Sequence, residues 1–201
     1  MSREQYLWGL SNGIGVLTLS GAFWLGLAAW ASGFGALLIA SAPILIVSGV
    51  LLFRNLQLRR RAAAFSPRSL RGAVKGSQSR RIIVGFSGIS AMQWVSIAAV
   101  GLICSAANHP ELIWPLIGLV VSIHFLPLGW LFGVRAYYVL GLGGMAIAAG
   151  SMLGLSGGAR LISIGLGLGL LTIASATYLI ANAEVLASAA TGPSSSRAGE
   201  G

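Results

Sequence analysis

Six long apolar runs, none interrupted by an acidic residue, a lysine or an arginine, constrain the fold of this chain more than any other feature. They cover residues 7–30, 33–53, 82–106, 112–132, 137–155 and 161–181. As an α-helix, each run of about 20 residues is long enough to cross a hydrocarbon core of ~30 Å. Only 8% of the chain is charged, whereas soluble domains average roughly 25%. We therefore predict an all-α integral membrane protein with six transmembrane helices.

One segment, residues 54–81, holds nine of the thirteen lysines and arginines and no acidic residue. The nine are Arg54, Arg59, Arg60, Arg61, Arg68, Arg71, Lys75, Arg80 and Arg81. Cytoplasmic loops of membrane proteins carry an excess of such cations. With this segment in the cytoplasm, the spans form three hairpins, both termini are cytoplasmic, and Arg160 is the one cation on the opposite side. The charge pattern thus predicts an N-in, C-in orientation.

The same pattern divides the chain into four parts. We expect a transmembrane hairpin at 1–53, a basic cytoplasmic loop at 54–81, transmembrane helices three to six at 82–185, and a disordered cytoplasmic tail at 186–201. Twelve arginines against one lysine are typical of a bacterium with a GC-rich genome. The expected location is therefore the bacterial cytoplasmic (inner) membrane, as a multi-pass protein.

Glycine accounts for 29 of 201 residues, about twice its ordinary share of ~7%. In a membrane, small residues let helices approach closely. Small residues four positions apart occur at Gly9/Gly13, Gly129/Gly133, Gly150/Gly154 and Gly165/Gly169. We expect such faces to pack helices within the chain and to bind a partner membrane protein or a second copy. The bilayer itself is the other expected partner, including anionic lipids at the basic loop, and no nucleic acid is expected.

Polar residues at membrane depth are the candidates for function, because they are costly there and tend to face the bundle interior or water. The candidate polar site consists of His124, Pro127, Gln93, Asn12 and Asn182. Pro127 leaves the Ile123 carbonyl without its helical donor, so the His124 imidazole and a free carbonyl could meet at one kink. A kink is also expected at Pro43 in the second span. The alternative is that these residues only make interhelical hydrogen bonds.

Other chemistries are excluded or demoted by composition, and we predict neither a cofactor nor a metal. The two histidines, His109 and His124, would lie ~22 Å apart on one helix, too far for a haem with two histidine ligands. The only lysine, Lys75, is in the loop, which argues against a retinal Schiff base. Glu111 follows Asn108 by three residues at a helix start, where a capping role is expected.

Two short motifs carry resemblances. The sequence His124-Phe125-Leu126-Pro127-Leu128 resembles a motif of small uncharacterised bacterial multi-pass membrane proteins, which implies no activity. Gly85-Phe86-Ser87-Gly88 is similar to the Gly-x-Ser-Gly of rhomboid intramembrane proteases, which have a six-helix core.

By the second resemblance, Ser87 would be a nucleophile and His124 its base. The chain departs from that family, because its histidine-bearing oxyanion helix is missing. In addition, Ser87 is expected near the inner face, whereas those active sites open outward.

These patterns favour one function, a small transporter or permease, and leave two alternatives. A small transporter or permease would use the kinked helices and the polar site near mid-membrane. A noncatalytic membrane scaffold would bind lipid or a partner through the basic loop and the glycine-rich faces. An intramembrane serine hydrolase would use Ser87. No catalytic residue is assigned.

Overall fold

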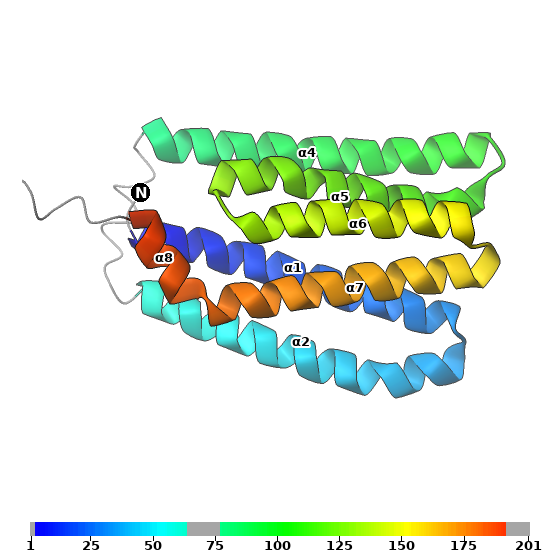
Figure 1. The fold of residues 1–201 in the computed structure, drawn as a ribbon, viewed down its shortest axis with the longest axis horizontal. Coiled ribbons are helices and arrows are strands. Elements are labelled where there is room, and N and C mark those ends of the chain that lie inside the picture. The colour runs from blue at the N-terminus through cyan, green and yellow to red at the C-terminus, as the bar shows by residue number, and fades with distance from the viewer. Residues whose placement is uncertain (1–2, 64–76, 192–201) are drawn as a thin grey trace, which may run out of the picture.

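The chain folds into six long helices and two short ones in the computed structural model, which describes residues 3–63 and 77–191 (Figure 1). The helices are α1 (Arg3–Ala31), α2 (Phe34–Ala63), α4 (Ser77–Ala106), η1 (Pro110–Leu112), α5 (Ile113–Phe132), α6 (Arg135–Gly154), α7 (Gly157–Ala181) and α8 (Ala183–Thr191). Six of these helices are long and apolar enough to cross a membrane, and the described residues contain no strand. The predicted all-α membrane fold is confirmed.

The six long helices form three hairpins that run side by side (Figure 1). The tight turns at 32–33, 107–109 and 155–156 lie together at one end of the bundle, which we call the far end. The start of α1, the end of α2 and the start of α4 lie at the opposite end, which we call the basic end. Both ends of the described chain are therefore at the basic end, as the hairpin prediction requires.

Glycines bring α1 and α7 into close contact, and this pair forms the centre of the bundle. A Cβ atom added at Gly165 would lie 2.7 Å from the Trp24 carbonyl oxygen, and one at Gly169 would lie 3.0 Å from the Leu25 backbone nitrogen. From the other side, a Cβ at Gly21 would lie 2.7 Å from Ile173. The two backbones can approach this closely because no side chain separates them.

A second close contact joins α5 to α6. A Cβ at Gly141 would lie 3.0 Å from the Ser122 carbonyl oxygen, and Gly144 packs directly on the Ser122 hydroxyl. Gly129 faces the Tyr138 ring in the same interface. Helices α1, α7, α5 and α6 thus form the packed part of the bundle, with fully buried side chains such as Ile14 and Ile164.

Helices α2 and α4 lie at the two edges of this packed part (Figure 1). Of the residues in the most apolar stretch of each helix, 6% are buried in α4 and 12% in α2, compared with 39% in α1 and 44% in α7. Large apolar side chains such as Trp94 and Leu102 on α4 and Leu45 and Phe53 on α2 are exposed. These faces suit contact with lipid or with another membrane protein.

The basic loop is shorter than predicted. Helix α2 continues ten residues past the expected span end, to Ala63, and α4 already begins at Ser77. Good helix formers such as Leu, Gln and Arg fill the extension of α2, so the helix continues where charge alone suggested a loop. Residues 64–76, including Arg68, Arg71 and Lys75, lie outside the described part. Pro43 and Pro127 both lie inside continuous helices.

The predicted disordered tail begins as a helix. Helix α8 extends to Thr191, and Ala183 and Ala187, four residues apart, are almost completely buried against the bundle. Alanine is the best helix former, and a stripe of alanines allows α8 to lie close on α1. Composition rich in Ala and Ser was therefore misread as disorder over residues 186–191, and residues 192–201 lie outside the described part.

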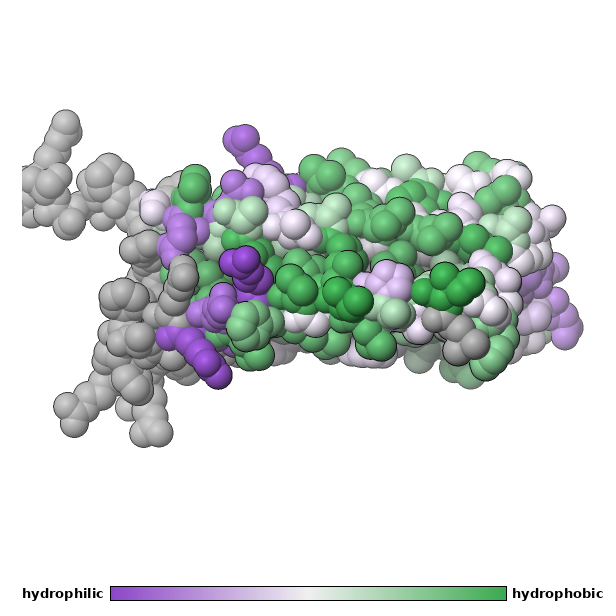
Figure 2. All heavy atoms as spheres, turned by 90° about the horizontal axis from the view of Figure 1, so that it is seen from below, coloured by the Kyte–Doolittle hydropathy of each residue, from purple (hydrophilic) through white to green (hydrophobic). Residues whose placement is uncertain are grey.

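The surface agrees with this arrangement. Hydrophobic residues cover most of the length of the bundle, and hydrophilic residues gather at its two ends (Figure 2). Arg54, Arg59 and Arg60 are exposed at the basic end. Arg61, Arg80 and Arg81 belong to α2 and α4 at the same end, although their side chains are not among those described.

Candidate functional site

The five residues of the predicted polar site do not gather at one place. Asn12 is on α1, Gln93 is on α4, His124 and Pro127 are on α5, and Asn182 follows α7. Helix α4 packs mainly on α5, whereas α1 packs mainly on α7 and α2. His124 therefore lies on a helix that packs against α4, which carries Gln93, whereas Asn12 and Asn182 lie on other helices.

His124 lies at the interface of α4 and α5, and helical spacing places Gln93 on the side of α4 that faces α5. The His124 imidazole lies against the backbone of Ile89 on α4 and is half-buried. Gln93 is one helical turn beyond Ile89, on the same face of α4 as Gly85, which packs on Leu131 of α5. No side-chain hydrogen bond joins His124 to Gln93 within the described residues. The arrangement fits interhelical contact better than a shared cavity.

Asn182 has a local role at the end of α7. Its side-chain amide donates to the Tyr178 carbonyl, with an Nδ2–O distance of 2.9 Å. Its own backbone N–H bonds the same carbonyl at 3.0 Å. Asn182 thus satisfies a carbonyl at the junction between α7 and α8 and points to no other helix.

Asn12 belongs to a polar cluster between α1 and α2 at the basic end. The Arg59 Nε–H donates to the Ser11 hydroxyl at an N–O distance of 2.8 Å, and the Arg59 Nη2 group donates to the Asn12 side-chain carbonyl. Ser11 is completely buried. One arginine of the predicted lipid-binding set is therefore held by α1.

Asn55 extends this cluster one turn deeper along α2. It is 4% exposed, and its amide nitrogen lies against Gly15 of α1, where an added Cβ would be 3.2 Å away. The Asn55 Oδ1 atom is buried without a hydrogen-bond partner among the described residues. The Ser48 hydroxyl, two turns farther along α2, is also buried and unpaired. Such groups are costly in a low-dielectric interior.

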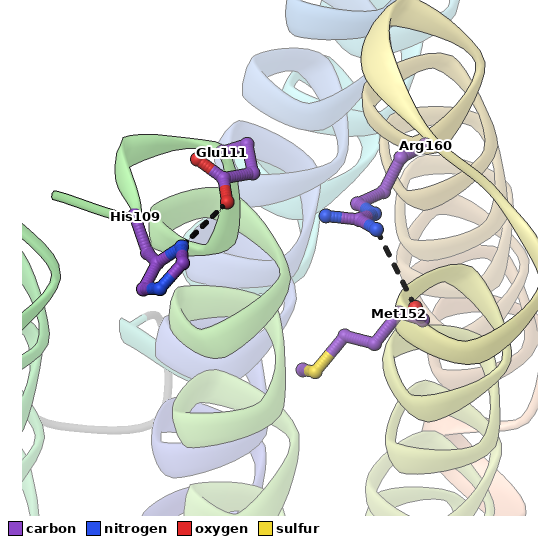
Figure 3. A network of polar contacts seen from close by, with 4 residues as sticks. All are labelled: His109, Glu111, Met152 and Arg160. Atoms are coloured by element: carbon purple, nitrogen blue, oxygen red, sulfur yellow. Dashed lines mark hydrogen bonds and ion pairs between the residues drawn. The ribbon is translucent and has the colours of Figure 1, made fainter. Parts of the chain in front are cut away.

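The far end holds a second set of polar contacts (Figure 3). The His109 Nδ1 and Glu111 Oε1 atoms are 3.0 Å apart, and both side chains are exposed. His109, not Asn108, occupies the N-cap position of η1, so the predicted Asn108 cap is wrong. Asn108 instead adopts a left-handed backbone conformation, with φ of 57°, in the turn.

Arg160, the single cation of the far end in the charge pattern, caps a helix. Its Nε–H donates to the Leu155 carbonyl at 2.9 Å and to the Ser151 carbonyl at 3.2 Å, and its Nη2 reaches the Met152 carbonyl (Figure 3). Ser151 and Met152 are in the last turn of α6 and Leu155 is its C-cap, and a cation is stabilising at a helix C-terminus. Arg160 therefore fastens α7 to α6.

Ser87 and His124, the two residues of the hydrolase hypothesis, lie on α4 and α5. Ser87 is exposed on α4, two residues from Gly85 and therefore turned away from the face that packs on α5. His124 faces Ile89 on that packed face. No hydrogen bond joins the Ser87 hydroxyl to His124 in the described part of the chain, so a nucleophile and its base are not paired here.

A hollow of about 240 Å³ lies between α1 and α2 toward the far end. It is lined by Leu25, Ala28, Ala29, Ser32, Ala36, Ala40, Pro43, Ile44 and Leu166. The Ser32 hydroxyl, its one polar side chain, is already bonded to the Ala28 carbonyl at 2.9 Å. The hollow is therefore apolar, and it contains none of the predicted site residues.

The described residues contain no group of three or more His, Cys, Asp or Glu side chains that could hold a metal ion. No protein-family model, curated protein sequence or solved structure matches this chain. The fold alone defines its class, which is that of polytopic membrane proteins with six transmembrane helices.

Sequence reasoning missed the roles of Ser11, Asn55 and Arg59. Ser11 precedes Asn12, and nothing in the sequence distinguishes it from the other serines of the spans. Asn55 and Arg59 lie in the segment predicted as a loop, and a spacing of four residues indicates a common face only in a helix. Had the helix been continued past Phe53, that spacing would have placed both side chains on one face of α2.

Proposed function

We propose that this protein is a noncatalytic membrane protein that binds anionic lipid at its basic end and a partner membrane protein along its sides. The observation that carries the proposal is the exposed arginines of α2 at that end, Arg54 and Arg60, which have no carboxylate partner among the described residues. Each cation at the membrane surface contributes ~1 kcal/mol to the binding of anionic lipid.

The partner proposal is supported by the distribution of glycines. Gly165 and Gly169 are used inside the bundle, but Gly150 and Gly154 on α6 have no heavy atom within 4 Å of an added Cβ. That predicted small-residue pair is available to another helix. A second copy of this chain and a different membrane protein are both compatible with such a face.

The lipid proposal is tested by replacing Arg54, Arg60, Arg61, Arg68 and Arg71 together with Gln. The variant and the natural chain are placed in nanodiscs of mixed phosphatidylglycerol and phosphatidylcholine, and the retained lipid is measured by native mass spectrometry. We expect a loss of anionic preference that is larger at low salt, because surface charges are screened over ~10 Å at 0.1 M salt. Unchanged preference in the five-residue variant would contradict the proposal, and Arg160→Gln at the far end is the control.

Transport stays a hypothesis with less support. The transport hypothesis requires the polar candidates to share one depth and one cavity. However, Asn12 accepts a hydrogen bond from Arg59, and Asn182 donates one to a carbonyl of its own helix. The specific feature still in its favour is the half-buried His124 on α5, which lies against Ile89, one helical turn from Gln93 on α4. Flux in proteoliposomes that falls in His124→Ala, but not in Asn182→Ala, would restore it. Labelling of Ser87 by a fluorophosphonate probe would similarly restore the hydrolase hypothesis.

A further inference from the structure

We propose that Arg59 is an oriented binding site for a phosphate group at the basic end, which makes it distinct from the neighbouring arginines. The site consists of the Arg59 guanidinium of α2 and the Ser11 and Asn12 side chains of α1 that hold it. This inference rests on the proposed lipid binding and narrows it from a charged surface to one residue.

The first step is the fixed orientation of the guanidinium. Its Nε–H is directed to the Ser11 hydroxyl at 2.8 Å, and Nη2 is directed to the Asn12 carbonyl. Ser11 is buried in the core, so the anchor itself cannot move freely. Arg60, the next residue, is exposed and makes no side-chain hydrogen bond to a described residue. A group already held in place loses less conformational entropy when it binds a ligand.

The second step is the chemistry that the anchors leave available. A guanidinium has five N–H donors, and the two bonds to α1 use two of them, so the described residues leave three available. Both anchors are neutral, and no carboxylate among the described residues pairs with Arg59. The planar fork of arginine matches two oxygens of a phosphate. Three donors and a positive charge that no described carboxylate neutralises therefore favour an oxyanion as the ligand.

The third step is position. The apolar span of α2 ends at Arg60, which places Arg59 at the depth of lipid headgroups. Exposed Arg54 and Arg60 lie within five residues and add to the positive potential. Of the acids whose side chains are described, Glu111 is at the far end, and Glu184 is on α8 at the basic end but forms no ion pair with Arg59 within the described residues. The ligand chemistry is a phosphate ester, from a lipid headgroup or from a free phosphate.

The test compares Arg59→Gln with Arg60→Gln in the full chain. The two variants have the same net charge and change adjacent residues of one helix. Binding of phosphatidylglycerol relative to phosphatidylcholine is measured by native mass spectrometry, and inorganic phosphate is added as a competitor in a separate arm. We expect Arg59→Gln to lower the preference about tenfold or more, since hydrogen bonds to charged groups contribute more than neutral ones, and Arg60→Gln to lower it by about twofold at most.

A third variant, Asn12→Asp, distinguishes a loss of phosphate binding at Arg59 from a loss caused by misfolding. Its carboxylate would pair with Arg59 across α1 and α2, so the thermal midpoint should be kept or raised while phosphate binding falls. Equal losses in Arg59→Gln and Arg60→Gln, or full phosphate binding in a folded Asn12→Asp variant, would overturn the site but leave the proposed lipid surface standing. Competition by inorganic phosphate would support the site and assign it to soluble phosphate esters, and its absence would assign the site to lipid.

Discussion

Helix α1 packs most extensively on two helices, α7 and α2, and it packs on them in different ways. Toward α7, Gly165 and Gly169 allow backbone contact, and the buried Thr18 and Thr172 hydroxyls are bonded to carbonyls of their own helices. Toward α2 there is an apolar hollow near Ala40, and the seam is fastened by the hairpin turn at one end and Arg59 at the other.

The unpaired polar atoms of Ser48 and Asn55 are also on α2. In a membrane, helices associate through packing and hydrogen bonds and not through a hydrophobic drive. An interface with a hollow and unpaired polar atoms is therefore weaker than one with glycine contacts and satisfied hydroxyls. The comparison teaches that α2 is the less firmly held helix, although it is the hairpin partner of α1.

The largest effect should come from filling the α7 side. Gly165→Leu places side-chain atoms where even a Cβ would be 2.7 Å from the Trp24 carbonyl oxygen. Because backbone cannot yield as a side chain does, we expect a loss of about 3 kcal/mol or more of unfolding free energy. Gly150→Leu on α6, where an added Cβ has no neighbour within 4 Å, is the matched control. Thermal unfolding in detergent checks both, and equal midpoints would contradict the close contact.

A smaller and opposite effect is expected on the α2 side. Ser48→Ala removes a buried hydroxyl without a partner, so it should raise the free energy of unfolding by about 1 kcal/mol. Ser122→Ala is the same substitution at a hydroxyl that donates to the Gly118 carbonyl at 2.6 Å, and it should give no gain. Chemical unfolding in mixed micelles measures the two. A loss of stability in Ser48→Ala would mean that the hydroxyl is paired in the membrane.

The smallest effect concerns the hollow. Ala40→Leu adds methyl and methylene groups to a space of about 240 Å³, whereas Ala42→Leu adds them to the exposed face of the same helix. Lipid tails are as apolar as leucine, so the gain comes only from packing, and we expect about 0.5 kcal/mol for Ala40→Leu. Hydrogen exchange of α2 should slow in Ala40→Leu alone. Equal slowing of hydrogen exchange in Ala42→Leu would show that filling the hollow is not the cause of the slowing.

The spans and their hairpin order could be predicted from the sequence because length and hydropathy determine which segments cross a bilayer. Helix ends beyond the membrane were harder. The extension of α2 to Ala63 and the helix α8 depend on helix propensity and on burial of Ala183 and Ala187, which a charge or composition pattern does not reveal.

The candidate site could not be predicted because membrane helices are apolar on all sides, so the sequence does not show which face meets which neighbour. Gly165 and Gly150 occur in identical small-residue patterns, yet one contacts a backbone and the other meets nothing within 4 Å. Asn12 and Gln93 are expected at one depth, but a common depth does not determine whether two side chains lie at the same interface. Their partners are set by the order of helices around the bundle.

The close contact between α1 and α7 has a consequence for biosynthesis. The first of the six spans pairs most extensively with the sixth, and about 150 residues separate Gly21 from its neighbours Thr172 and Ile173. Until α7 has been synthesised, Gly21 and the Trp24 carbonyl lack the α7 residues that they contact in the folded chain. A chain that stops before Gly157 would expose this unfilled groove in the bilayer, where quality-control proteases or insertion chaperones can distinguish it from a finished molecule.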